Sequence, residues 1–347
     1  MRVVVAMSGG VDSSTVAGLL HEAGHEVIGV TLQLYDQGAA AGRKGACCAG
    51  RDIADARRVC DQLGVAHYVI DAEARFRQAV IADFADSYAA GRTPVPCIRC
   101  NQSVKFTDLL ALARDLGAER LATGHYVQRL EGAEGAELHR AVDPARDQSW
   151  FLFATTRAQL EFSLFPLGGM PDKAAVRREA QRLGLPVAEK PDSQDICFVP
   201  SGSYAEAVVR LRPEAGEAGE ITDESGRVLG RHDGVAGYTV GQGKRLGQAA
   251  GQGRRVVAID PARRRVVVGQ GGERTRLRLT EVNWLVPPGP LAVQAKLRAR
   301  APLVQAAVSP LAGDAAEVEL AAPMLATPGQ ACVFYAGERV LGGGFIQ

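Results

Sequence analysis

The chain has 347 residues, 46% of them hydrophobic and 23% charged, and its formal net charge is +1. A chain of this length accommodates about two or three domains with cores of their own, and its composition is that of an ordinary soluble protein. No stretch approaches the roughly 20 apolar residues that span a membrane, and the first residues lack the features of a signal peptide. We therefore expect a cytoplasmic, monomeric protein without membrane contact, in which any nucleic-acid binding depends on local patches.

The chain opens on a predicted strand, a glycine-rich turn and a helix. Residues 3–7 form an apolar run typical of a buried parallel strand, Ser8-Gly9-Gly10 breaks it, and residues 13–23 have helical spacing. Free backbone N–H groups and the positive end of the helix dipole then point at one spot, which predicts an anion site. Asp12 beside this site predicts a Mg²⁺ ion between its carboxylate and bound phosphates. The alternative is a simple βα turn in which Asp or Ser caps the helix.

Strands and helices alternate over the residues that follow. Periodicity and turn residues predict strands at 26–34, 67–70 and 120–123, helices at 52–63, 76–88, 103–116 and 172–183, and a hairpin at 127–142. This alternation predicts the α/β class, a doubly wound parallel sheet that binds its ligands at the carboxyl ends of the strands. We place this first domain at residues 1–200.

From residue 201 the sequence changes to an all-β pattern. Short strand-like runs between Gly, Asp and Pro turns occur at 219–222, 256–259, 265–268, 293–300, 316–320, 331–335 and 339–341. We divide this part into a small central β-domain, 201–275, and a C-terminal β-barrel-like domain, 276–347. Within it Lys296, Arg298 and Arg300 alternate, which predicts a basic stripe on one face of a strand, suited to phosphates.

The chain has seven cysteines with irregular spacing, which argues against a framework of structural disulfides. Cys100 precedes a predicted helix and lies near Lys105, and both a helix N-terminus and a cation lower the pKa of a thiol. Cys197 lies in an irregular segment. Cys97 and Cys100 have the spacing of a metal site or a redox pair, and with Cys197 they offer three thiolates to an iron–sulfur cluster.

Several sequence blocks together point to one family. The octapeptide 7–14, MSGGVDSS, resembles the PP-loop of ATP-dependent adenylating enzymes. Further blocks resemble those of the tRNA-specific 2-thiouridylases, in that family's order: PVPCIRCNQSVKF, ATGHY, DQSWFL, SQDICF, YTVGQGKRLG and TPGQACVFYAGERVLGGG. The resemblance runs from residue 3 to residue 346 and covers all three proposed domains. It implies a PP-loop domain followed by two β-domains.

The resemblance implies ATP-dependent 2-thiolation of the wobble uridine of tRNA. The uridine O2 attacks the α-phosphate of ATP, which gives an adenylated base and pyrophosphate. Cys197 carries a persulfide sulfur, supplied by a cysteine desulfurase or a sulfur-relay protein, to C2, and AMP leaves. Cys100 is implied to be the second nucleophile, and the cycle ends in a Cys100–Cys197 disulfide. The implied ATP-binding residues are Ala6, Met7, Ser8, Gly9, Gly10, Val11, Asp12, Ser13, Leu32 and Gly124, with Asp12 also catalytic and in contact with Mg²⁺.

The resemblance also implies contacts with tRNA. The implied residues are Val95, Pro96, Cys97, His125, Asp147, Gln148, Ser149, Arg298, Ala299 and Gln330. Without the resemblance, we would interpret His125 as a histidine with satisfied hydrogen bonds at the end of a strand, and Gln330 as a turn residue. Val95, Gly243 and Ala299 depart from the family, which usually has Asn, Arg and an aromatic residue at these positions, and fine RNA contacts there are in doubt.

Other functions are consistent with parts of this pattern. An amidotransferase or synthetase of the PP-loop class, acting on a small molecule, would need neither Cys100 nor Cys197. An iron–sulfur-dependent tRNA thiolase would use Cys97, Cys100 and Cys197 as cluster ligands; we do not favour this cofactor. A non-catalytic nucleic-acid-binding protein would function without Asp12. We expect ATP and Mg²⁺ as the cofactors and tRNA as the partner.

Overall fold

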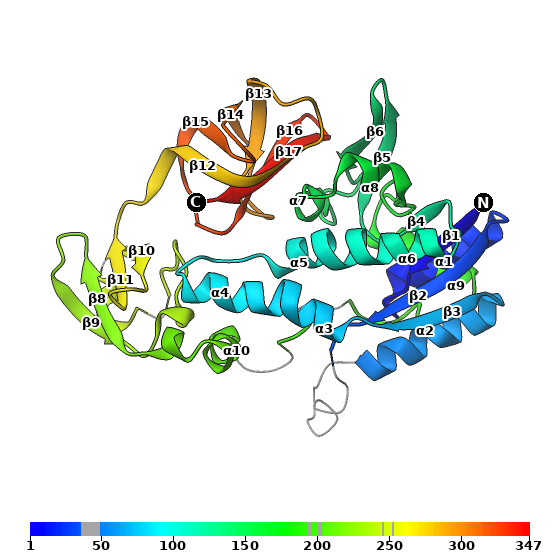
Figure 1. Cartoon of the computed structure of the whole chain (residues 1–347), viewed down its shortest axis with the longest axis horizontal. Helices are drawn as coiled ribbons and strands as arrows, with labels where there is room; N and C mark the ends of the chain where they lie inside the picture. The colour runs from blue at the N-terminus through cyan, green and yellow to red at the C-terminus, as the bar shows by residue number, and fades with distance from the viewer. Residues whose placement is uncertain (36–48, 193–195, 200–202, 245, 252) are drawn as a thin grey trace. The chain divides into compact units, whose positions relative to one another are not determined.

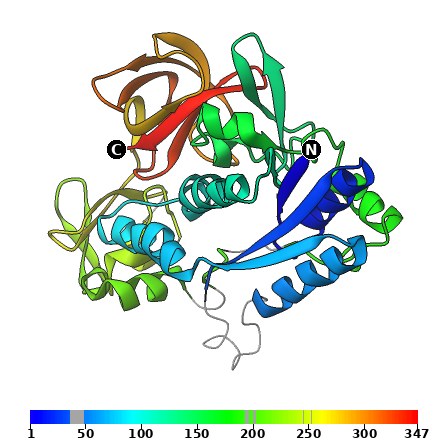
Figure 2. The ribbon, with the colours of Figure 1, turned by 45° about the vertical axis from the view of Figure 1, so that its right-hand side comes forward.

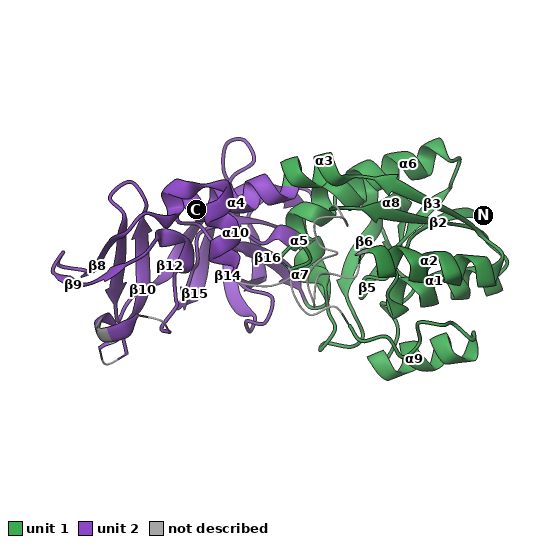
Figure 3. Cartoon of the chain, turned by 90° about the horizontal axis from the view of Figure 1, so that it is seen from below, with its two compact units in different colours: residues 1–79, 97–200, 337–341 green, residues 80–96, 201–336, 342–347 purple. Residues whose placement is uncertain are grey.

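The computed structural model describes residues 1–35, 49–192, 196–199, 203–244, 246–251 and 253–347. The chain divides into two compact units, which Figure 3 shows in different colours. Unit 1 comprises residues 1–79, 97–200 and 337–341, and unit 2 comprises residues 80–96, 201–336 and 342–347. None of the helices in the described ranges has the length and hydropathy needed to cross a lipid bilayer.

A parallel sheet forms the centre of unit 1 (Figure 1). Its strands are β1 (Arg2–Ala6), β2 (Glu26–Gln33), β3 (Ala66–Asp71), β4 (Arg120–Ala122) and β7 (Ser163–Leu164). They pair in the order β3-β2-β1-β4-β7, and each of these pairings is parallel. Val3, Val4 and Val5 of β1 are fully buried, as expected for a strand with both faces covered. The predicted α/β class with a doubly wound parallel sheet is confirmed.

Helices α1 (Val11–Glu22), α2 (Ala49–Leu63) and α9 (Lys173–Arg182) build a hydrophobic core of unit 1 together with β1. α1 packs against both α2 and α9, and α2 runs along β2 and β3 (Figures 1 and 2). α9 begins as predicted because the side chain of Asp172 accepts a hydrogen bond from the N–H of Ala175, at 2.6 Å. This packing brings the first turn of α9 to the first turn of α1.

Longer helical runs change between α-helical and π-helical hydrogen bonding along the chain. One consists of α3 (Glu73–Phe76), η1 (Arg77–Ala82) and α4 (Asp83–Ala89), and it confirms the helix predicted over 76–88. Another consists of α5 (Pro96–Arg99), η2 (Cys100–Leu109) and α6 (Leu110–Asp115). The predicted start of this helix at Ser103 is wrong, because proline is favourable at a first helical position, where its missing N–H would have had no partner. Both η1 and η2 have the wide π-helical turn, which is frequent at functional sites.

A hairpin and short helices lie between β4 and α9. β5 (Val127–Gly132) and β6 (Gly135–Arg140) form the predicted antiparallel hairpin, and β6 also pairs with β17 at a single position. Two short helices follow, α7 (Ser149–Leu152) and α8 (Arg157–Phe162).

Unit 2 begins with a small sheet. Its strands are β8 (Gly219–Asp223), β9 (Val228–His232), β10 (Arg255–Asp260) and β11 (Arg265–Gly269), in the order β10-β11-β8-β9. Around them along the chain lie α10 (Tyr204–Leu211), η3 (Pro213–Gly216), η4 (Val235–Gly237) and η5 (Gly247–Ala250). α10 packs against α4, where the rings of Tyr88 and Tyr204 stack with their centroids 5.1 Å apart.

A closed β-barrel follows. Its strands are β12 (Glu273–Trp284), β13 (Leu291–Lys296), β14 (Val304–Pro310), β15 (Ala316–Leu325), β16 (Ala331–Ala336) and β17 (Arg339–Ile346). They run in the order β12-β15-β14-β13-β16-β17, and pairing of β12 with β17 closes the barrel, which confirms the predicted barrel-like fold. The predicted basic stripe is wrong. β13 ends at Lys296, and the chain then turns, with the N–H of Ala301 donating to the carbonyl oxygen of Arg298 at 3.0 Å.

Candidate functional site

The turn between β1 and α1 presents unpaired backbone donors. Gly9 has a φ of +74°, and Gly10 precedes the helix without any side chain capping it. Among the described residues, no acceptor faces the backbone N–H groups of Gly9, Gly10, Val11 and Asp12. Unpaired N–H groups at the positive end of the α1 dipole are the arrangement that the sequence predicts for an anion site.

Side chains of the turn support its shape. The N–H of Ser8 donates to Oγ of Ser13 at 3.1 Å, and the hydroxyl of the fully buried Ser14 donates to the carbonyl oxygen of Gly10 at 2.8 Å. Gly124, after β4, lies against α1, since a Cβ there would be 2.9 Å from the N of Ser13. Leu32 lies near the carboxyl end of β2. The sheet thus brings the implied ATP-binding residues to its carboxyl edge, as the α/β rule predicts.

Replacing Gly9 with alanine is expected to destabilise unit 1 by at least about 3 kcal/mol. The new Cβ would lie 2.1 Å from the backbone oxygen of Asp52, and the φ of +74° is itself unfavourable for alanine. Gly24→Ala is the matched control, because Gly24 has a φ of +79° but no atom lies within 4 Å of the position that its Cβ would take; its cost should be about 1 kcal/mol. Urea unfolding measures both, and equal losses would contradict the close contact with Asp52.

Asp12 belongs to a network of charges that sequence patterns did not predict. The ammonium of Lys173, the first residue of α9, donates to both carboxylate oxygens of Asp12, at 2.7 and 2.8 Å. The hydroxyl of Tyr126 donates to Oδ1 of Asp12 at 2.6 Å. Lys173 also pairs with Asp192 at 2.8 Å, and Asp192 pairs with Arg146 at 2.7 Å. Burial disfavours the charged carboxyl group of Asp192, but the hydrogen bonds from Lys173 and Arg146 outweigh burial and lower its pKa.

Cys97, Cys100 and Cys197 belong to unit 1, and none of the three is joined to another described residue by a disulfide. Cys97 is exposed in the first turn of the helix that starts at Pro96, and Cys100 is buried. Cys197 is exposed, in a turn closed by a hydrogen bond from the N–H of Val199 to the carbonyl oxygen of Ile196, at 3.0 Å. The implied Cys100–Cys197 disulfide is therefore not formed in this structure. Within the described ranges, no three His, Cys, Asp or Glu side chains gather closely enough to hold a metal ion.

Burial decides the ionisation of Cys100. The residue is 8% exposed, and desolvation raises the pKa of its thiol, while the charge of Lys105 acts in the opposite direction and is the smaller effect. The expectation of a lowered thiol pKa is wrong for this conformation, because Cys100 lies one turn inside the helix rather than at its N-terminus. The ammonium of Lys105 donates instead to Oδ1 of Asn101, at 3.0 Å.

The implied RNA-binding residues of unit 1 are largely engaged inside the fold. His125 bonds through Nδ1 to the hydroxyl of Thr123 at 2.8 Å, and burial lowers its pKa well below the usual value, so the ring is neutral. The side chain of Asp147 is 2% exposed and accepts hydrogen bonds from Arg140 and from both N–H and hydroxyl of Ser149. Gln148 is half-buried, and its side-chain oxygen accepts a hydrogen bond from the N–H of Tyr126 at 2.9 Å.

Two of the implied RNA-binding residues of unit 2, Arg298 and Gln330, line a pocket of about 330 Å³. It is lined by Thr93, Thr239, Val240, Gly241, Gln242, Arg298, Thr327 and Gln330. Arg298 is half-buried and donates to the hydroxyl of Thr327 at 2.7 Å, and it has no carboxylate partner in the described part of the chain. Gln330 donates to the carbonyl oxygen of Thr93 at 3.1 Å. Ala299 lies in the turn after β13, and Val95 and Pro96 continue the segment that Gln330 anchors.

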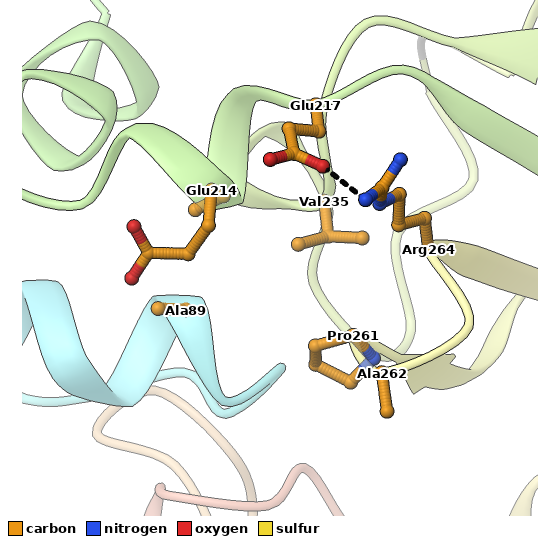
Figure 4. Close-up of a pocket in the computed structure, with 8 residues that line it drawn as sticks. Ala89, Glu214, Glu217, Val235, Pro261, Ala262 and Arg264 are labelled. Atoms are coloured by element: carbon orange, nitrogen blue, oxygen red, sulfur yellow. Dashed lines mark ion pairs between the residues drawn. The ribbon is translucent and has the colours of Figure 1, made fainter.

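A second pocket of unit 2, of about 220 Å³, lies beside the turn between β10 and β11 (Figure 4). Arg264 at its edge pairs with Glu217, as the dashed line in Figure 4 shows. The charges of the neighbouring arginines are also balanced, since Arg263 pairs with Asp260 and Arg265 pairs with Glu220. The charges of Arg263, Arg264 and Arg265, at the turn and the start of β11, are thus balanced locally.

The fold and the arrangement of the site define a class of protein. A parallel sheet with a glycine-rich turn that leaves N–H groups unpaired at the start of a helix is the architecture of a nucleotide-binding α/β protein. Family models match the chain as a tRNA methyl transferase HUP domain over residues 1–201, a tRNA methyl transferase PRC-barrel domain over residues 209–270 and an aminomethyltransferase beta-barrel domain over residues 274–346.

Similar proteins specify the family. The chain is 69% identical to the tRNA-specific 2-thiouridylase MnmA of Acidiphilium cryptum, over 100% of both chains. It is 62% identical to the protein of the same name from Gluconobacter oxydans, over 100% of this chain and 99% of the other, and 58% identical to that of Rhodospirillum centenum, over 99% and 91%. The chain belongs to the tRNA-specific 2-thiouridylase family.

Proposed function

We propose that this chain catalyses the ATP-dependent 2-thiolation of the wobble uridine of tRNA. The observation that carries the proposal is the anion site of unit 1. It combines unpaired N–H groups at the start of α1 with the Asp12–Lys173 pair, in a unit that also holds the thiols of Cys100 and Cys197. Phosphate binding, a cation at the leaving group and a sulfur carrier are what adenylation followed by thiolation requires.

In the proposed first step, O2 of the uridine attacks the α-phosphate of ATP and pyrophosphate leaves. The N–H groups of Gly9, Gly10 and Val11 would bind phosphate oxygens, because donors fixed in advance stabilise the charge that develops there. The ammonium of Lys173 contacts the carboxylate of Asp12 at 2.7 Å, in the first turn of α1, and it would bind the pyrophosphate through the same charge. A carbonyl oxygen leaves readily only once it carries AMP, which explains why ATP is needed.

Asp12 suits a Mg²⁺ ion that arrives with ATP. Its side chain is 31% exposed, and Asp12 lies in the first turn of α1, directly after the glycine-rich turn. Mg²⁺ commonly takes one or two protein carboxylates and fills its other positions with phosphate oxygens and water. When bound, the ion would neutralise charge on the phosphates, and Asp12 would hold it at the start of α1.

In the proposed second step, Cys197 carries a persulfide received from a cysteine desulfurase or a sulfur-relay protein. The terminal sulfur attacks C2 of the adenylated uridine, AMP leaves, and the base becomes linked to Cys197 through a disulfide. The thiolate of Cys100 then attacks Sγ of Cys197, which releases 2-thiouridine and forms a Cys100–Cys197 disulfide. A dithiol reductant supplies two electrons to restore both thiols.

The test is an assay with an unmodified tRNA transcript, ATP, Mg²⁺ and a cysteine desulfurase supplied with cysteine. We expect 2-thiouridine at the wobble position, detected by mass spectrometry of nucleosides, together with AMP and pyrophosphate. Release of AMP and pyrophosphate only with a small-molecule acceptor, without thiolation of tRNA, would contradict the proposal and favour another PP-loop enzyme.

Arg298 is proposed to bind a phosphate of the tRNA. Its guanidinium lies half-buried in a pocket without a carboxylate partner among the described residues, where burial lowers its pKa and an anion would restore the lost solvation. Arg298→Ala should weaken tRNA binding about tenfold and reduce the slope of log K against log[salt] by about one. Arg276→Ala is the control, since Arg276 is exposed on β12 and pairs with Glu319 at 3.2 Å. Equal effects of the two variants would contradict this role.

A further inference from the structure

Lys190 lies against the glycine-rich turn, where the turn meets the start of α2. Its ammonium donates to the carbonyl oxygen of Gly9 at 2.9 Å, to Oδ1 of Asp52 at 2.6 Å and to Oδ2 of Asp55 at 2.5 Å. These three acceptors match the three N–H donors of an ammonium group, and the side chain is only 20% exposed. Burial disfavours the charge, but the two carboxylates outweigh burial and raise the pKa of Lys190, which stays protonated.

The bond to Gly9 fixes the direction of the next N–H group. In a trans peptide, the carbonyl oxygen and the following N–H point in opposite directions, and the described part of the chain contains no cis peptide. Because the Gly9 carbonyl oxygen is turned toward Lys190, the N–H of Gly10 is turned away from it. The same N–H belongs to the group without acceptors that forms the anion site.

The backbone around Lys190 is itself held in place. Arg177 of α9 donates to the carbonyl oxygens of Ala188 and Lys190, at 2.7 and 2.9 Å. Two residues later, Asp192 pairs with Lys173 at 2.8 Å. The ammonium of Lys190 therefore starts from a fixed backbone position, and that backbone leads into the segment that carries Cys197.

We propose that Lys190 is a positioning residue for the adenylation step: it holds the Gly9–Gly10 peptide so that the Gly10 N–H faces the phosphates of ATP. The inference rests on the proposed function and adds to it a residue that does not touch the nucleotide. Lys190 also belongs to the backbone segment that leads to Cys197. A displacement of that segment would therefore move the ammonium and change the geometry of the glycine-rich turn.

The test separates the bond to Gly9 from the ion pairs. Lys190→Met removes both, and it leaves two carboxylates without their cation, which lowers stability as well. The triple variant Lys190→Met/Asp52→Asn/Asp55→Asn removes those charges and should regain stability against urea. We expect the ATP dissociation constant, measured by calorimetry on the full chain, to rise about tenfold or more in both variants. Lys190→Arg, which keeps a donor for Gly9, should recover most of the affinity.

The control is Arg182→Gln, which breaks an exposed ion pair with Glu22 at the other end of α9 and should leave ATP affinity unchanged. Wild-type affinity in the triple variant would overturn the inference, since the ion pairs alone would then explain Lys190. An unchanged dissociation constant in Lys190→Met, or no ATP binding by the wild type, would overturn it too. Failure of the wild type to thiolate tRNA while Lys190→Met still weakens ATP binding would overturn the proposed function and leave this inference standing.

Discussion

Cys197→Ser is expected to reduce 2-thiouridine formation by at least about 10³-fold while ATP binding stays within about twofold of the wild type. A serine hydroxyl cannot carry a persulfide sulfur, whereas the glycine-rich turn and its N–H groups are left unchanged by a substitution at the exposed position 197. Cys100→Ser should reduce the release of 2-thiouridine by a similar factor. The block is at a later step, because the base would stay linked to Cys197 by a disulfide. A non-reducing gel should then show tRNA attached to the protein, and dithiothreitol should release it.

The alternative role of the cysteines predicts a different result. If the protein purified without oxygen contains iron, if activity follows the iron content, and if Cys97→Ser also fails, then Cys97, Cys100 and Cys197 are cluster ligands. A persulfide mechanism predicts full activity in iron-free protein and no trapped tRNA in Cys197→Ser. The two outcomes exclude each other, and the same three variants distinguish them.

Lys173→Met is expected to lower kcat/KM for ATP by at least about 100-fold, since it removes a cation from the place where we propose that pyrophosphate leaves. The loss should fall mainly on kcat, because charge develops on the leaving group in the transition state rather than in the bound substrate. Steady-state measurement of pyrophosphate release with saturating tRNA gives both constants. Lys173→Arg, which keeps a cation beside Asp12 and Asp192, should retain most of the activity.

A structural role alone for Lys173 predicts another pattern. The ammonium separates Asp12 from Asp192, at 2.7 and 2.8 Å, so its removal also lowers the free energy of unfolding. Lys173→Met/Asp192→Asn removes one of the carboxylates that lose their cation and should recover part of that stability. If the double variant also recovers kcat, then Lys173 only holds the fold together, and the proposed contact with pyrophosphate is wrong.

Local chemistry explains why much of unit 1 could be predicted. The turn after β1 needs glycine, because Gly9 has a φ of +74° and lies against the backbone of Asp52. The start of α9 follows from Asp172, whose side chain caps the helix by accepting a hydrogen bond from the N–H of Ala175. The same local reasoning placed the start of the helix that follows Val95 at Ser103, whereas Pro96 begins it, because proline is favourable at a first helical position.

The sequence by itself determined the anion site, the parallel sheet and the presence of two cysteine segments, since turns, caps and hydrophobic periodicity depend on neighbouring residues. Only the tertiary structure decided which side chains serve that site. Lys173 and Lys190 contact the turn from 161 and 181 positions away, and no spacing rule connects them to it. Tertiary structure also decided that Cys100 is buried and its thiol pKa raised. Pairings between distant residues and the desolvation of a group both arise from how helices pack on the sheet, and neither leaves a pattern in the local sequence.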